Sequence, residues 1–184
     1  MLIIKRRGFT MKRRTVLQGF AAAATLPLIA SIGHEHAVAN YVDSVSITPL
    51  EKLPEAWRGT ISEESFRVLF KEETELPGSS HLNQEKRDGT YVCAACFLPL
   101  FKSKHKYESG TGWPSFTQPF AEHIGTKRDL KMIIPRIEYH CARCGGHQGH
   151  VFNDGPLPRK ERWCNNGLAL QFVLRSDPLP ELRS

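Results

Sequence analysis

Two Cys-x-x-Cys pairs constrain what this chain can fold into. They are Cys93/Cys96 and Cys141/Cys144, with 44 residues between them. Each pair can form a tight turn that aims two sulfurs at one point, and four such sulfurs suit a tetrahedral zinc ion. For all four sulfurs to bind one ion, the fold must bring these two turns together although they are far apart in the sequence. We therefore expect a four-cysteine site for one structural Zn²⁺.

Two other uses of these cysteines are open. In an oxidising compartment they could form two disulfides, either local or crossed. A redox Cys-x-x-Cys is a further alternative, although nothing that resembles a thioredoxin βαβ unit surrounds either pair. Gly145-Gly146 can supply the positive-φ backbone that a metal-binding turn needs, whereas the first pair continues into Phe97.

Residues 1–39 have the features of a cleaved secretory signal. Arg13-Arg14 precede an alanine-rich apolar run from Val16 to Ile32, and Ala37-Val38-Ala39 form a small-residue cleavage site. Paired arginines before a weakly hydrophobic run favour the twin-arginine route. The run is short and broken by Pro27, so we expect cleavage rather than a retained membrane anchor. The predicted location is periplasmic or otherwise exported.

Cleavage of this segment would remove most of the excess positive charge of the chain. Residues 1–39 hold six Lys/Arg and one acid, so the formal net charge falls from +6 to +1 in the mature chain. The excess basic charge belongs to the signal, so it does not support nucleic-acid binding. We expect one monomeric domain with no stable membrane association after cleavage.

The mature chain divides into three parts. Residues 40–59 are predicted to be an extended lead-in, 60–175 the folded domain and 176–184 a loose tail. Thr60-Ile61-Ser62-Glu63 fits a capping box, which predicts a helix through about Glu73. A shorter helical turn is expected within 81–86.

From Thr90 onward the pattern is that of β strands. Residues 136–141 alternate, which predicts Ile137, Tyr139 and Cys141 on one face and Arg136, Glu138 and His140 on the other. Leu168, Leu170, Phe172 and Leu174 alternate in the same way, and Asn153-Asp154-Gly155-Pro156 is a turn. The predicted fold class is mainly β, a small antiparallel β domain with short N-terminal helices.

The fifth cysteine, Cys164, has no partner in either pair. It lies in Arg162-Trp163-Cys164-Asn165-Asn166, and a guanidinium nearby favours the reactive thiolate. Two other segments stand out. His147 and His150 flank a Gln-Gly pair close to Cys144, so they could also bind the zinc or support its ligands. Trp113 lies on a glycine-rich loop, where it could simply pack.

Together these segments resemble one family, the methionine-R-sulfoxide reductases of type B, from about Thr60 to Val173. The matching motifs are the cysteine pairs, Ser109-Gly110-Thr111-Gly112-Trp113-Pro114-Ser115-Phe116, Gly149-His150-Val151-Phe152-Asn153-Asp154-Gly155-Pro156 and Arg162-Trp163-Cys164-Asn165-Asn166. The resemblance implies a β-rich fold with a zinc ion held by four cysteines. It also implies an oxidoreductase that reduces the R epimer of methionine sulfoxide in proteins.

The residue chemistry suits that reaction. Cys164, favoured as thiolate by Arg162, would attack the sulfoxide sulfur and become a sulfenic acid. His147 or His150 would donate a proton to the oxygen. The other expected site residues are Asn166, which would orient the oxygen or a bridging water, and Trp113 and Phe152, which would bind the substrate, with Trp113 as a wall for the S-methyl group.

Three positions depart from the family pattern. Many members have a second cysteine where this chain has Thr111, so we expect an external reductant, either a thioredoxin-like partner or a small thiol. Asn165 and Gln148 replace residues that are more often apolar, which bears on substrate preference.

Two other function classes are open at this point. The chain could be a non-catalytic zinc-binding interaction module with Cys164 buried in the core, although its Arg and Asn neighbours argue against an apolar pocket. It could also be a thiol-disulfide oxidoreductase that uses the Cys-x-x-Cys pairs. Thiol titration separates them, because only the reductase would show one reactive thiol with zinc retained.

Overall fold

A computed structural model of the chain describes residues 47–131 and 134–184. The expected signal peptide and the start of the lead-in lie outside the described residues. Strands dominate the part that is described, which confirms the predicted mainly β class. The strands are β1 (Gly89–Cys93), β2 (Pro99–Lys102), β3 (Lys106–Tyr107), β4 (Ser115–Phe116), β5 (Ile124–Asp129), β6 (Arg136–Cys141), β7 (His147–Phe152), β8 (Arg162–Asn165) and β9 (Leu170–Leu174).

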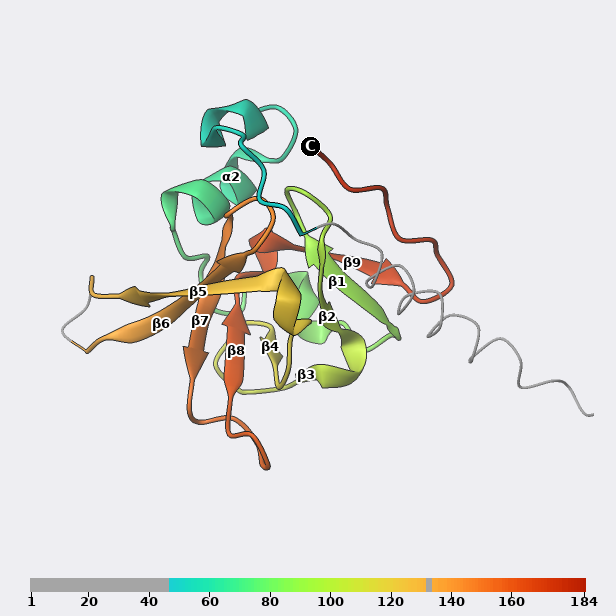
Figure 1. Cartoon of the computed structure of the whole chain (residues 1–184). Helices are drawn as coiled ribbons and strands as arrows, with labels where there is room; N and C mark the ends of the chain where they lie inside the picture. The colour runs from blue at the N-terminus through green and yellow to red at the C-terminus, as the bar shows by residue number, and fades with distance from the viewer. Residues whose placement is uncertain (1–46, 132–133) are drawn as a thin grey trace, which may run out of the picture.

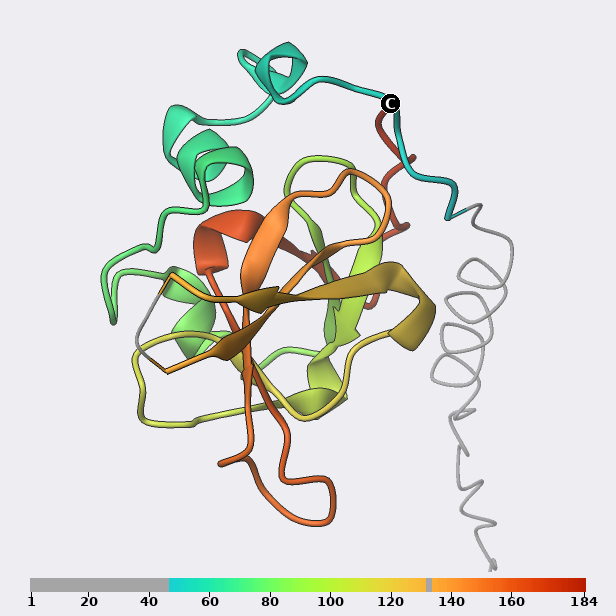
Figure 2. The ribbon, with the colours of Figure 1, turned by 60° about the vertical axis from the view of Figure 1, so that its left-hand side comes forward.

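The strands form two antiparallel sheets, which Figure 1 shows from one side. One is three-stranded, with the order β2-β1-β9, and the other is six-stranded, with the order β3-β4-β8-β7-β6-β5. β8 and β7 lie in the middle of the larger sheet, and their pairing places Cys164 opposite His150. The hairpin of β5 and β6 projects from one side of the molecule, and the loop between β7 and β8 from its base (Figures 1 and 2).

Aromatic side chains fill the core between the two sheets. Phe101 of the small sheet stacks on Phe116 of the large one, with ring centroids 4.1 Å apart. Tyr91 meets the same Phe116 edge-on at 4.9 Å, and Tyr139 meets Trp163 at 5.0 Å. Each of these rings removes a large apolar area from water, worth about 1.5–3 kcal/mol. The core therefore holds the face of β8 opposite Cys164 in place.

The single α helix described, α2 (Glu63–Lys71), lies against the end of the large sheet (Figure 1). It begins later than the predicted capping box, because the N-cap is Ser62, whose hydroxyl accepts from Ser65 N. It also ends earlier, at a left-handed Glu72. The 3-10 turns are η1 (Pro54–Trp57), η2 (His81–Gln84), η3 (Ser103–His105), η4 (Ala121–His123) and η5 (Gly167–Ala169).

Both ends of the domain make contacts that the sequence did not predict. The lead-in is not simply extended, because η1 carries Trp57 into the core, where it is fully buried. The tail lacks regular structure but is not loose at its end. Arg183 donates its backbone N–H to Cys96 O at 3.1 Å, and its guanidinium lies 3.8 Å from the centroid of the Phe97 ring. No helix within 47–131 or 134–184 has the length and apolar character needed to cross a membrane.

β6 has the predicted bounds, but its two faces are not buried as expected. Ile137 is 42% exposed, whereas Glu138, on the expected polar face, is 3% exposed. Glu138 is buried because it meets two basic groups, with Lys127 Nζ at 3.2 Å and His147 Nδ1 at 2.9 Å. The predicted alternation at 168–174 becomes the turn η5 followed by β9, so Leu168 precedes the strand.

Candidate active site and metal centre

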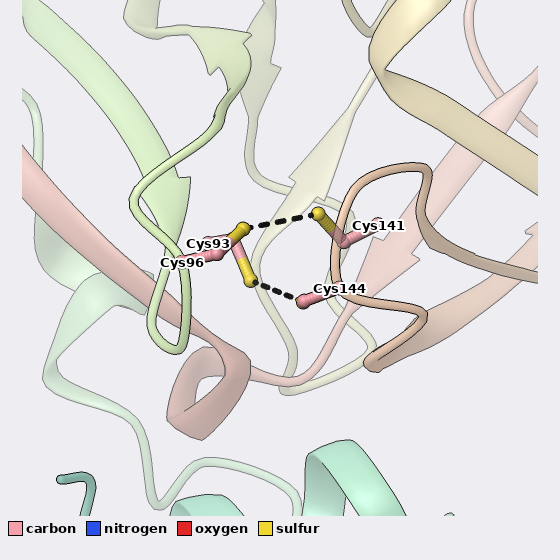
Figure 3. Close-up of side chains that lie close together, drawn as sticks. All are labelled: Cys93, Cys96, Cys141 and Cys144. Atoms are coloured by element: carbon pink, nitrogen blue, oxygen red, sulfur yellow. Dashed lines mark hydrogen bonds between the residues drawn. The ribbon is translucent and has the colours of Figure 1, made fainter. Parts of the chain in front are cut away.

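The two Cys-x-x-Cys pairs meet, as Figure 3 shows. Cys93 ends β1 and Cys141 ends β6, and in each case the chain turns back tightly. The backbone N–H of Phe97 donates to Cys93 O, and that of Gly145 donates to Cys141 O, both at 2.9 Å. Phe97 and Gly145 both have positive φ, 63° and 73°. The first turn therefore has the same shape as the second although it lacks the glycine.

The four sulfurs fit a tetrahedral metal ion. All lie within 4.8 Å of one another, with Cys93–Cys144 at 3.6 Å and Cys96–Cys141 at 3.5 Å. Zn–S bonds of about 2.3 Å place sulfurs about 3.8 Å apart in a tetrahedron. Burial raises the pKa of the Cys141 thiol well above its ordinary value, so thiolates here need a cation to compensate them. Zn²⁺ bound to these sulfurs would clamp β1 to β6.

Cys164 lies in a row of side chains across the six-stranded sheet. Residues directly opposite each other in antiparallel strands point to the same face. Cys164 is opposite Ser115 of β4 on one side and His150 of β7 on the other. The row in strand order is Tyr107, Ser115, Cys164, His150, Glu138 and Lys127. Strand register therefore brings together a thiol and a histidine 14 residues apart.

A small pocket of about 150 Å³ opens beside Cys164. Its lining residues are Thr74, Trp113, Arg136, Gly149, His150, Phe152, Cys164, Asn165 and Asn166. Pockets for drug-sized ligands measure about 300–1,000 Å³, so this one has room for the end of a side chain. Five of the predicted site residues meet here, whereas His147 and Arg162 do not line the pocket.

Burial and charge act in opposite directions on Cys164. Burial raises the pKa of its thiol, and this outweighs the charge of Arg162 and the hydrogen bonds from Thr111 and Arg162, which lower it. The expectation that Arg162 leaves a ready thiolate was therefore too simple. Its guanidinium is held by both oxygens of Asp154, at 2.7 and 2.9 Å, and lies 4.3 Å from the centroid of Phe152. Burial therefore disfavours the thiolate form of Cys164 in the free site.

The two histidines have different surroundings. His150 Nε2 lies 2.8 Å from Asp129 Oδ2, which leaves the other ring nitrogen free for chemistry. Burial lowers the pKa of His150, and the Asp129 carboxylate offsets part of this. His147 is buried behind it, with ring centroids 5.5 Å apart, and its contact with Glu138 lacks hydrogen-bond geometry. Position alone therefore favours His150 as the residue that can touch a bound substrate.

The side chains of Trp113 and Asn166 are both hydrogen-bonded to the main chain of Glu75. Trp113 Nε1 donates to Glu75 O at 3.2 Å, and Glu75 N donates to Asn166 Oδ1 at 3.1 Å. The Glu75 carboxylate is buried and accepts the backbone N–H groups of Gly167 and Leu168, at 2.6 and 3.0 Å. Asn166 Nδ2 donates to the main chain of Gln148 at 3.1 Å, so the amide is bound at both ends. These bonds fix two walls of the pocket.

Sequence reasoning missed several residues of this site. Asp129 and Arg136 face one another across the β5–β6 hairpin, and Arg136 Nη2 donates to Asp129 Oδ2 at 2.7 Å. A predicted hairpin with opposite charges at paired positions would have been a usable signal, but only 136–141 was recognised as a strand. No local sequence pattern marks Thr74 and Glu75 as site residues, because they lie in a loop that only the fold brings to the site.

The fold and site define a class: a β-sheet protein with a half-buried thiol in a small pocket and a separate cluster of four cysteines that could hold a metal ion. A family profile described as the SelR domain matches residues 61–174. Proteins named peptide methionine sulfoxide reductase MsrB are similar over most of the chain. That of Caulobacter vibrioides is 49% identical over 134 residues, covering 72% of this chain and 84% of the relative.

Other relatives of the same name come from distant organisms. The protein of Leptospira interrogans is 46% identical and covers 67% of this chain and 95% of its own. That of Methanosarcina barkeri is 44% identical, with 67% and 87% covered. The chain therefore belongs to the SelR-domain family, the type B methionine sulfoxide reductases, and is an oxidoreductase.

Proposed function

We propose that this enzyme reduces the R epimer of peptide-bound methionine sulfoxide, with Cys164 as the nucleophile. The observation that carries the proposal is the pairing of Cys164 with His150 at a pocket the size of a side-chain end. Trp113 and Phe152 line the same pocket and supply apolar surface for the S-methyl group. A methionine sulfoxide on a peptide can enter such a site while its backbone stays outside.

The reaction moves one oxygen atom. Cys164 Sγ attacks the sulfoxide sulfur, the oxygen leaves that sulfur and bonds to Cys164, and methionine is released. The methionine sulfur gains two electrons and the cysteine sulfur loses two, which gives a sulfenic acid. His150 takes the thiol proton and passes it to the oxygen, where it becomes the sulfenic hydroxyl. Burial raises the pKa of the Cys164 thiol and lowers that of His150, which opposes a separate thiolate–imidazolium pair and favours proton transfer concerted with attack on the sulfoxide.

Replacement of His150 should separate the roles of the two histidines. We expect His150→Asn to slow a single turnover by about 10²–10⁴-fold, because it removes the group that delivers the proton. His147→Asn should have the smaller effect, since His147 lies behind the pocket. Rapid-quench measurement of methionine formation gives both rates. A larger loss in the His147 variant would reverse the assignment.

An epimer-resolved assay tests the function itself. Purified protein is given a peptide that contains both sulfoxide epimers, with dithiothreitol as the thiol donor, and the residual epimers are separated by chromatography. Consumption of the R epimer alone supports the proposal. Consumption of the S epimer, or of neither, overturns it.

The sulfenic acid requires an external thiol. Thr111 Oγ1 hydrogen-bonds to Ser109 at 2.9 Å and carries no sulfur, and the four other cysteines are gathered in the metal centre. An incoming thiol would form a mixed disulfide with Cys164 and release water, and a second thiol would then free Cys164. Mass spectrometry of enzyme oxidised without thiol should show the sulfenic acid. An internal disulfide to Cys164 would contradict this step.

Export by the twin-arginine route is the remaining part of the proposal. The basis is the order of Arg13-Arg14, an apolar run and Ala37-Val38-Ala39. A domain that binds a metal through thiolates gains from folding before it leaves the reducing cytosol. Replacement of both arginines by lysine should retain the protein inside bacterial cells that express it. Unchanged export would show that another route is used.

A further inference from the structure

Gln148 and Asn165 form a polar contact inside the core. Both side chains are fully buried, and Asn165 Nδ2 donates to Gln148 Oε1 at 3.3 Å. The Oδ1 of Asn165 accepts from Tyr139 OH at 2.7 Å. Buried amides are costly unless they are hydrogen-bonded. Asn165 Nδ2 also donates to Asn166 O at 2.8 Å, so the contact matters most for Gln148 Oε1.

The other end of Gln148 reaches the metal centre. Its Nε2 lies 3.6 Å from Cys93 Sγ, within the range of an N–H to sulfur hydrogen bond. A thiolate that binds a metal retains negative charge, and a donor beside it stabilises that charge and fixes the sulfur in place. The Gln148 side chain therefore lies between a metal-binding sulfur and a neighbour of Cys164.

The backbone of Gln148 extends the connection to the catalytic strand. Gln148 O accepts from Asn166 N at 2.8 Å as well as from the Asn166 side chain. The next residue, Gly149, lies so close to β8 that a Cβ there would be 1.9 Å from Cys164 O. β7 and β8 therefore cannot move independently here, and a shift of Gln148 would displace Asn165 and Asn166, the two residues that follow Cys164.

We propose that Gln148 is a positioning residue that couples the metal centre to the catalytic strand. Its amide steadies Cys93 on one side and Asn165 on the other, and its carbonyl holds Asn166. The coupling to catalysis rests on the proposed function, whereas the coupling to the metal does not. Loss of this amide should therefore loosen the metal and slow the chemical step together.

The test compares Gln148→Leu, Asn165→Val and the double variant in the full-length, zinc-loaded protein. Zinc release to a chromophoric chelator at 25 °C is expected to be about 10–100-fold faster for Gln148→Leu. We expect kcat to fall while KM changes little. Gln171→Leu, on the exposed side of β9, is the matched control and should release zinc at the unmodified rate. The double variant should be more stable than the sum of the single effects predicts, because no buried amide is left half-paired.

If the leucine variant does not fold, Gln148→Asn replaces it in the test. This variant keeps a side-chain amide, but the asparagine side chain is too short for its amide to reach Cys93. It too should accelerate zinc release. Release at the unmodified rate from a folded Gln148 variant overturns the proposal, whatever happens to activity. Faster release with unchanged kcat overturns the catalytic half. A failed epimer assay with faster release would reject the proposed function and leave the metal coupling standing.

Discussion

Cys164→Ser should abolish methionine sulfoxide reduction while the metal centre stays intact. Serine is close in size to cysteine but is a far weaker nucleophile, and no other thiol lines the described pocket. We expect the single-turnover rate to fall on the order of 10⁴-fold or more, in line with removal of a covalent nucleophile. Methionine formation is measured by rapid quench with the R epimer in excess.

The same variant provides its own control. Cys164 lies on the opposite face of β8 from the aromatic core and is not among the clustered sulfurs. Zinc content and the midpoint of thermal unfolding should therefore stay at the values of the unmodified protein. Turnover that survives the change would mean that a different group attacks the sulfoxide.

Cys96→Ser should have the largest effect on stability. Cys96 is fully buried, and its sulfur lies 3.5 Å from that of Cys141. Structural zinc sites contribute about 10–16 kcal/mol of apparent binding free energy. A domain is stable by only about 5–15 kcal/mol, so weakening this site can unfold it. We expect low zinc content and loss of the cooperative thermal transition followed by circular dichroism.

Cys164→Ser is the matched control for that experiment, because it makes the same chemical change outside the metal centre. A disulfide pairing of the four cysteines predicts a different pattern. In that case dithiothreitol would lower the unfolding midpoint of the unmodified protein and a zinc chelator would not. The metal centre predicts the reverse.

Local patterns in the sequence were enough for much of the fold. The alternation at 136–141 gave β6 with its bounds, and the spacing of the cysteine pairs predicted that the two turns meet. The capping pattern found α2 but misplaced its start, because Ser62 competes with Thr60 as N-cap. The burial of Glu138 was beyond such patterns, since it depends on Lys127 and His147, which come from two other strands.

The pKa of Cys164 likewise could not be predicted from neighbouring residues in the sequence. Arg162 is two residues from Cys164, so the sequence suggests a charge that favours the thiolate. In the folded chain Asp154 binds that guanidinium, and burial raises the pKa of the thiol. A pKa responds to everything within several ångströms, and most of those groups are distant along the chain.

The residue types carry the chemistry, because thiols, imidazoles and their spacing specify which reactions and metals are possible. The four-cysteine cluster follows from the spacing of the cysteine pairs, and the alternation of apolar residues predicted the β class. Tertiary packing determined which of several residues of the same type lies at the site. Strand register placed His150 directly opposite Cys164, and the loop that carries Glu75 placed Trp113 and Asn166. Tertiary packing also placed Gln148 in contact with both Cys93 and Asn165. Local sequence does not contain this information, because strand register and loop packing depend on contacts between residues that are distant along the chain.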